Sequence, residues 1–179
     1  MRIHHLRPLA QLALLVGVIL LSGCAVTDVH RSEPLSRQAQ WALLPIANHS
    51  ETPLAGQKAE ASLTTLLHQQ GISSLTQAPR PPQQNLLALP SEQDYQAALS
   101  WAQQQGARYG VTGSVDEWHY KTGLDGEPAI GISLRVVDVN TGDILWSASG
   151  ARSGWGFSTT SGVAQKLMAD LVDTLPVQQ

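Results

Sequence analysis

The clearest structural signal in the chain is the stretch Ile130-Gly-Ile-Ser-Leu-Arg-Val136, followed by Asn140-Thr-Gly-Asp143 and Ile144-Leu-Trp-Ser-Ala148. Apolar side chains at every second position of the first segment are typical of a strand with one buried face. The middle segment has turn composition, and Gly142 can adopt the positive φ that a tight turn requires. The stretch therefore predicts two antiparallel strands joined by a hairpin.

Upstream of this hairpin, short apolar runs alternate with segments of helical spacing, and a further helical segment follows it. Residues 107–120 alternate like a strand, with Val115 and Glu117 on one face and Trp118 on the other. Residues 76–90 contain four prolines, which exclude regular structure across most of that stretch and indicate a surface excursion. The predicted elements are strands at 41–46, 72–75, 107–120, 130–136 and 144–148, and helices at 55–70, 91–106 and 158–175.

The order of these elements, β-α-β-α-β-β-β-α, predicts the fold class. Alternating strands and helices followed by a β meander suit one mixed sheet with helices packed on it. We therefore expect a single domain of the α/β class, in the α+β sense of a mixed sheet.

The amino-terminal residues have the pattern of a bacterial lipoprotein signal. Two arginines precede an apolar run from Leu9 to Leu21, which is too short for an ordinary membrane span. Leu21-Ser-Gly-Cys24 then places the only cysteine where such signals carry the lipidated residue. A plain secretory peptide is the alternative interpretation. We predict a lipoprotein signal peptide at 1–23, a lipidated tether at 24–39 and a periplasmic α/β domain at 40–179.

The residue that follows Cys24 indicates in which membrane the lipoprotein is anchored. Ala25 stands where an aspartate would favour retention in the inner membrane, so we expect the outer membrane, with the protein on its periplasmic face. Several acyl chains on Cys24 would anchor the domain permanently, because each buried CH₂ contributes about 0.8 kcal/mol.

Composition and motifs exclude several functions. Removal of residues 1–23 takes away two of the 11 Lys and Arg residues and none of the 14 Asp and Glu residues, which leaves a net charge of −5. An acidic domain of this kind has no footprint for nucleic acid. No common catalytic motif is present, and histidines 30, 49, 68 and 119 show no metal-ligand spacing. We therefore expect that the protein is not an enzyme and has no catalytic residues. We also expect it to bind no metal and no cofactor besides the lipid on Cys24.

Two features remain as candidate functional elements. The first is a concentration of six carboxylates between Thr112 and Asp143, of which Asp116, Glu117, Asp125 and Glu127 are the candidate site residues and Asp138 and Asp143 are the others. Ordinary turn and loop residues are the alternative explanation. The second is Trp155, which is flanked by glycines between the last strand and the last helix, and which we expect to be exposed. The other tryptophans lie within periodic elements and are expected in a core or an interface.

The segments Thr112-Gly-Ser-Val-Asp-Glu-Trp118 and Trp146-Ser-Ala-Ser-Gly-Ala-Arg-Ser-Gly-Trp155 carry a family resemblance. Over roughly residues 106–156 the chain resembles the PelC family of outer-membrane lipoproteins, which serve export of the Pel exopolysaccharide. The resemblance implies a fold related to CsgG and the TolB amino-terminal domain, and a homo-oligomer, a periplasmic ring of twelve subunits. It also implies that this dodecameric ring guides a cationic, partly deacetylated amino-sugar polymer to a β-barrel porin with a tetratricopeptide-repeat scaffold.

On this interpretation each candidate residue acquires a role. The four carboxylates form a negative surface that guides the polymer, and Trp155 contacts the membrane. Arg108 makes an intersubunit or ring-lining contact, for which an exposed arginine at a strand end is the alternative. Trp101 and Trp118 exceed the needs of a small core and support ring formation. The main alternative is a lipoprotein that activates a periplasmic cell-wall synthase, and a hydrolase with an unrecognised site is a weaker one.

Overall fold

The computed structural model describes residues 25–31, 33–80, 92–121, 126–155 and 157–178, which form a six-stranded sheet, a two-stranded sheet and three helices. The signal peptide and Cys24 lie outside these residues and remain predictions. The strands are β1 (Ala25–Arg31), β2 (Leu35–Ser36), β3 (Trp41–Asn48), β4 (Leu75–Gln77), β5 (Tyr109–Tyr120), β6 (Pro128–Asp138), β7 (Ile144–Ser153) and β8 (Val177–Gln178), and the helices are α2 (Ala55–Gln69), α3 (Glu92–Gln104) and α4 (Thr160–Val172).

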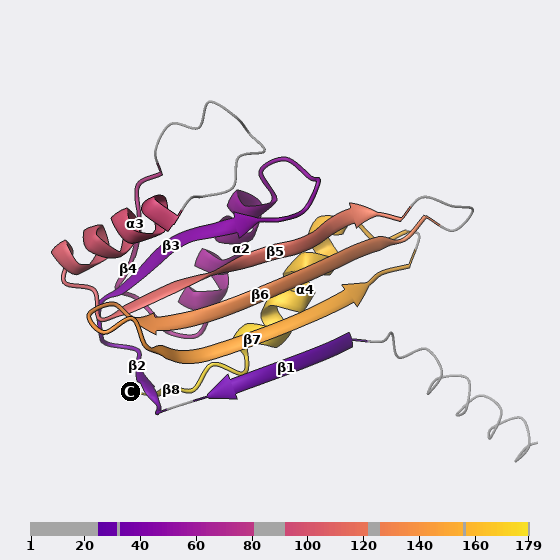
Figure 1. Cartoon of the computed structure of the whole chain (residues 1–179). Coiled ribbons are helices and arrows are strands. Elements are labelled where there is room, and N and C mark those ends of the chain that lie inside the picture. Colours follow the sequence, from indigo (N-terminus) through magenta and orange to yellow (C-terminus); the bar gives the residue numbers. More distant parts are fainter. Residues whose placement is uncertain (1–24, 32, 81–91, 122–125, 156, 179) are drawn as a thin grey trace, which may run out of the picture.

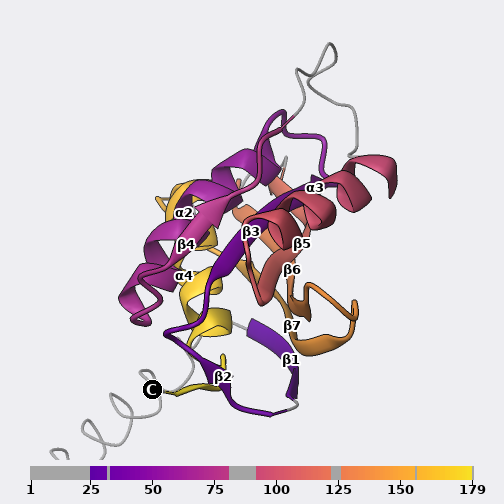
Figure 2. The same ribbon diagram turned by 90° about the vertical axis from the view of Figure 1, so that its left-hand side faces the viewer.

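The large sheet has the strand order β1-β7-β6-β5-β3-β4. Strands β5, β6, β7 and β1 pair antiparallel in succession, whereas β3 runs parallel to both β4 and β5. Helices α2 and α4 lie on one face of this sheet, and α3 lies on the other face beside β3 (Figures 1 and 2). The predicted fold class is confirmed: from β3 to α4 the elements follow the predicted order, and β1, β2 and β8 are additional.

The main hydrophobic core fills the space between the sheet and helices α2 and α4. Trp41 and Leu43 of β3 point into this core, while the alternate residues Ala42 and Leu44 belong to a smaller core under α3. Trp146 of β7 is also fully buried in the main core. Because both cores meet at β3, this strand is covered on both faces, and β5, β6 and β7 are covered mainly by α2 and α4.

A bulge in β3 explains the two buried polar residues of the described chain. Pro45 has no N–H, and the pairing of β3 with β5 shifts register between Leu43 and Ile46. Thr112 Oγ1 donates a hydrogen bond to the C=O of Pro45 at 2.7 Å, and Glu60 Oε1 accepts one from the N–H of Ile46 at 2.7 Å. Side chains therefore satisfy the backbone groups that the bulge removes from the ladder.

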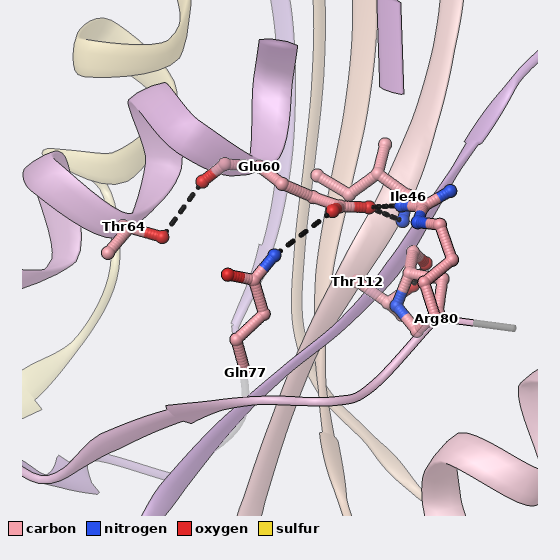
Figure 3. A network of polar contacts seen from close by, with 7 residues as sticks. Ile46, Glu60, Thr64, Gln77, Arg80 and Thr112 are labelled. Atoms are coloured by element: carbon pink, nitrogen blue, oxygen red, sulfur yellow. Dashed lines mark hydrogen bonds and ion pairs between the residues drawn. The ribbon is translucent and has the colours of Figure 1, made fainter. Parts of the chain in front are cut away.

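Glu60 is held by further partners that converge on it from outside its helix (Figure 3). The Arg80 guanidinium forms an ion pair with Oε1, and Gln77 Nε2 donates to Oε2 at 3.3 Å. The carboxylate is therefore paired and hydrogen-bonded, as a buried charge must be. The cluster fixes α2 and the segment after β4 against the bulge of β3.

The tether predicted at 24–39 is wrong for much of its length. Ala25–Arg31 forms β1, which pairs with β7, and Leu35–Ser36 forms β2, which pairs with β8. The side chains of residues 27–31 are exposed, so backbone hydrogen bonds rather than burial hold β1 at the sheet edge. A polar edge strand and a polar tether have the same composition, which is why the sequence pattern did not separate them.

The other predicted elements differ less from those of the structure. The strand predicted at 72–75 begins later, as Leu75–Gln77, because the N–H of Ile72 donates to the C=O of Leu67 at 3.2 Å and so still belongs to the end of α2. The hairpin turn is confirmed, with Gly142 at a φ of +79°. Within the described part of the chain, no helix is both long and apolar enough to cross a membrane.

Candidate functional site

The candidate site lies on the face of β5, β6, β7 and β1 that points away from α2 and α4. We call it the open face; in Figure 1 the strands pass in front of α2 and α4, so it is turned toward the viewer. Residues directly opposite each other on paired strands share a face. The register places Ser114 of β5 opposite Ser133 of β6, Ser133 opposite Ser149 of β7, and Ser149 opposite Asp28 of β1. A row of short polar side chains therefore crosses four strands.

Asp116 lies next to this row, and two of its serines orient the Asp116 carboxylate. The hydroxyl of Ser114 donates to Asp116 Oδ1 at 2.9 Å, and that of Ser133 donates to Oδ2 at 3.2 Å. The side chain of Asp116 is exposed. Each carboxylate oxygen can accept more than one hydrogen bond. Asp116 therefore presents to solvent a fixed carboxylate that can accept further hydrogen bonds.

A second bulge brings Glu117 to the same face. The register of β5 against β6 shifts between Val115 and Glu117, which makes Asp116 the extra residue. The prediction that Glu117 shares a face with Val115 and opposes Trp118 is wrong. Trp118 is 3% exposed and lies in the main core with Val115, while Glu117 and Asp116 both border one hollow of the open face. One inserted residue reverses the faces of every residue beyond it.

This hollow, which we call the acidic hollow, has a volume of about 330 Å³. Its charged lining residues are Asp28, Asp116 and Glu117, and none of the lining residues that the structure describes is basic. Space exists between the carboxylates because Gly131 carries no side chain: a Cβ there would lie 3.3 Å from that of Glu117. Three carboxylates from β1 and β5 therefore surround one solvent-open depression.

A second depression adjoins the first, and we call it the serine hollow. Its volume is about 630 Å³, and it shares Asp28, Ser133 and Ser149 with the acidic hollow. Its other polar lining residues are Ser114, Ser147, His30, His49 and Arg135.

Arg135 provides the positive charge of the serine hollow. Its guanidinium carbon lies 5.7 Å from the ring centroid of Tyr95 on α3, within range of a cation–π contact. Burial raises the pKa of Tyr95 above its usual value, and the positive charge of Arg135 opposes that shift. None of the ion pairs among the described residues involves Arg135. The open face therefore has an acidic part and a part that carries a guanidinium.

The four predicted carboxylates do not all lie together. Asp116 and Glu117 line the acidic hollow, whereas Glu127 lies at the β5–β6 hairpin, where its C=O accepts the N–H of Lys121 at 2.8 Å, and it lines neither hollow. Asp125 lies outside the described residues. The prediction missed Asp28, because its strand had been interpreted as a tether; the β-branched residues around it, Val26, Thr27 and Val29, were the available signal.

Trp155 lies at the end of the sheet where β1 begins. Its side chain is 69% exposed, and the neighbouring Phe157 is fully exposed. Ala25, the first residue of β1, pairs with Arg152, three residues before Trp155. The exposure predicted for Trp155 is therefore confirmed, and the residue after Cys24 lies close to it along the edge of the sheet.

Arg108 lies at the opposite end of the sheet. It immediately precedes β5, its side chain is exposed, and its guanidinium carbon lies 5.1 Å from the ring centroid of Tyr109. A twelve-residue strand spans about 40 Å at 3.3 to 3.4 Å per residue, so Arg108 is far from Trp155. Trp101 of α3 is partly buried and packs against the smaller core, whereas Trp118 belongs to the main core, so Trp118 is not a surplus interface residue.

Among the described residues, no three His, Cys, Asp or Glu side chains are grouped closely enough to hold a metal ion. The described lining of the acidic hollow contains three carboxylates and neither a histidine nor a thiol. Such a set can attract a cationic group by charge and hydrogen bonding.

Comparison with known proteins completes the description. The sequence matches no protein-family model and no curated protein. The structure is similar to the PelC dodecamer from Paraburkholderia phytofirmans, with 36% sequence identity, a TM-score of 0.74, and coverage of 87% of this chain and 100% of that chain. A methionine variant of that dodecamer in another crystal form gives 35% identity and a TM-score of 0.75 with the same coverage.

A more distant likeness concerns the fold alone. The lipoprotein GNA1162 from Neisseria meningitidis has 19% identity and a TM-score of 0.52, with 75% of this chain and 96% of that chain covered. The PelC match is of a different order, because more than a third of the residues are identical across the whole of the matched chain. This chain therefore belongs to the PelC family.

Proposed function

We propose that the protein is an outer-membrane lipoprotein that forms a periplasmic ring and guides a cationic exopolysaccharide to its outer-membrane porin. The export serves biofilm formation, and the porin is a β-barrel with a tetratricopeptide-repeat scaffold. The proposal requires no bond to be made or broken in the polymer, so the protein acts as a binding and guiding component rather than an enzyme.

The acidic hollow is the observation that carries this proposal. Asp28, Asp116 and Glu117 line one depression, and hydroxyl hydrogen bonds hold the Asp116 carboxylate toward solvent. A protonated amino sugar presents an ammonium group with three donors, which matches a surface made of acceptors. The position is also shallow and solvent-open, which suits a polymer that must bind and then move on.

The strength of each contact is expected to be small. An ammonium 4 Å from an exposed carboxylate gains about 1 kcal/mol in water, and charges farther apart than about 10 Å are screened at 0.1 M salt. Relatives of this chain form dodecamers. In a ring of twelve copies the acidic hollows would act together, so binding would be multivalent, reversible and strongly dependent on salt.

The proposed attachment to the membrane uses the other end of the sheet. Cys24 directly precedes β1, so its lipid would lie beside exposed Trp155 and Phe157. An indole favours the headgroup level of a bilayer because it has an apolar body and a polar N–H. Lipid and aromatic residues would together orient each subunit with this end toward the outer membrane.

The test compares two triple variants of equal charge change. Asp28→Asn, Asp116→Asn and Glu117→Gln remove the carboxylates of the acidic hollow, while Glu33→Gln, Glu51→Gln and Glu92→Gln remove three exposed carboxylates elsewhere. The variants of the acidic hollow are expected to lose binding of a fully deacetylated glucosamine oligomer and export in cells, with the ring retained in native mass measurements. Equal effects of both triple variants, or no effect of the first, would contradict the proposal.

A further inference from the structure

We infer that the serine hollow is a binding site for a carboxylate group, with Arg135 as the residue that recognises it. The ligand class is a singly charged organic acid, either free or as the acidic side chain of another protein. This inference does not rest on the proposed function, because the recognising group is the guanidinium in the serine hollow and not the carboxylates of the acidic hollow.

Arg135 is available to a ligand. Its side chain is exposed, and it takes part in none of the ion pairs among the described residues. Its guanidinium carbon lies 5.7 Å from the ring centroid of Tyr95, which is itself half-buried on α3. A cation–π contact restricts the position of a guanidinium without neutralising its charge. Arg135 therefore presents a positioned positive charge to the serine hollow.

The strand register places two further hydrogen-bond donors in line with Arg135. Arg135 lies opposite Ser147 of β7, and Ser147 lies opposite His30 of β1. Adjacent strands are about 4.8 Å apart and paired residues share a face, so the three residues form a second row across the open face. All three line the serine hollow. A guanidinium, a hydroxyl and an imidazole each carry at least one donor, so the row suits an anion.

The charges around Arg135 favour an anion with one negative charge over an anion with two. Arg135 is the only Lys or Arg in the described lining of the serine hollow, whereas Asp28 adds a carboxylate. Asp116 accepts a hydrogen bond from Ser133, which is two residues, or about 7 Å, from Arg135 along β6. Both carboxylates repel a dianion such as phosphate more than a monoanion. A carboxylate carries a single charge and can form two parallel hydrogen bonds with a guanidinium.

An apolar contact lies beside the row. Ile144 of β7 lines the serine hollow with a side chain that is 48% exposed, and it pairs with Val137, two residues beyond Arg135 on β6. A short hydrocarbon stem can cover Ile144 while its carboxylate remains at Arg135. The volume of about 630 Å³ lies within the 300 to 1,000 Å³ range of small-molecule sites. The site therefore fits a carboxylate on a short apolar stem, as in an aliphatic acid or a glutamate side chain.

The experiment titrates the purified protein with hexanoate and with hexanamide, an uncharged analogue of nearly the same shape, and measures dissociation constants by ligand-observed NMR. Hexanoate is expected to bind about fivefold more tightly, the upper value for an exposed charge pair. Arg135→Gln is expected to remove this difference, and Arg135→Lys to retain part of it, because lysine keeps the charge without the planar fork. The matched control, Lys166→Gln on the exposed surface of α4, removes the same charge elsewhere and should change nothing.

Two further arms identify the source of the carboxylate and separate the two hollows. Glutamate with both backbone ends blocked binds more tightly than hexanoate if the natural ligand is a protein side chain, and less tightly if it is a free acid. Asp116→Asn removes a repelling charge and is expected to strengthen hexanoate binding slightly. Weaker binding in that variant, equal binding of hexanoate and hexanamide, or equal behaviour of Arg135→Gln and Lys166→Gln overturns the inference. None of these results depends on polymer binding, so the proposed function fails or stands separately.

Discussion

Replacing Glu60 with alanine would test whether the bulge of β3 depends on a buried carboxylate. The substitution leaves the N–H of Ile46 without its acceptor and Arg80 without its ion-pair partner. An orphaned buried N–H costs about 1 to 3 kcal/mol, and breaking a buried ion pair costs about 3 to 5 kcal/mol. The Arg80 side chain is 21% exposed and can regain some water, so the lower end applies. We expect a loss of about 3 kcal/mol.

The assay is equilibrium urea unfolding of the soluble domain. With a slope of about 2 kcal/mol per M, the expected loss lowers the unfolding midpoint by about 1.5 M. Glu60→Gln should cost less, because its amide oxygen still accepts from Ile46. Glu51→Ala is the control, since Glu51 is exposed and makes no comparable contact. A midpoint for Glu60→Ala that matches the Glu51→Ala control would refute the role assigned to this carboxylate.

Three further predictions concern the remaining candidate residues. Trp155→Ala together with Phe157→Ala is expected to leave stability unchanged and to reduce liposome binding of the unlipidated ring in flotation assays; unchanged flotation would remove the aromatic residues from the membrane contact. Arg108→Glu is expected to shift the sedimentation coefficient toward smaller species if Arg108 joins subunits, and a wild-type value would exclude it from the interface. The raised pKa of Tyr95 favours its neutral form in the folded state. The stability that this provides is complete below about pH 10, the unfolded value, and is lost as pH rises through the folded pKa. Tyr95→Phe should therefore flatten the decline of unfolding free energy above pH 10, and a decline equal to that of the wild type would contradict the assignment.

The central elements could be predicted because burial imposes a period on their sequences. Ile130, Ile132 and Leu134 alternate along β6 since one face of that strand contacts the main core. Gly142 marked the hairpin because the turn requires a positive φ there. Where one face of an element is buried, the spacing of apolar residues therefore reveals both the element and its orientation.

The candidate site was only half predicted, for two physical reasons. A bulge adds one residue without changing the composition of a strand, so the alternation around Asp116 gave the wrong face for Glu117. An edge strand with exposed side chains shows no apolar period, so Asp28 was assigned to a tether. The acidic hollow depends on both features, and its geometry could be found only from the paired strands.

Strand β1 links the proposed membrane anchor to the proposed polymer site. Its first residue follows the predicted lipidated Cys24, and its middle residue, Asp28, supplies the third carboxylate of the acidic hollow. The exposed side chains of residues 27–31 give β1 little burial, so pairing with β7 is what holds it in place. A lipid on Cys24 would fix the start of the strand at the bilayer and restrict the freedom of the undocked chain. Anchoring would therefore favour the docked strand, and with it the complete acidic hollow, so the segment that fastens the protein also completes the surface proposed to receive the polymer.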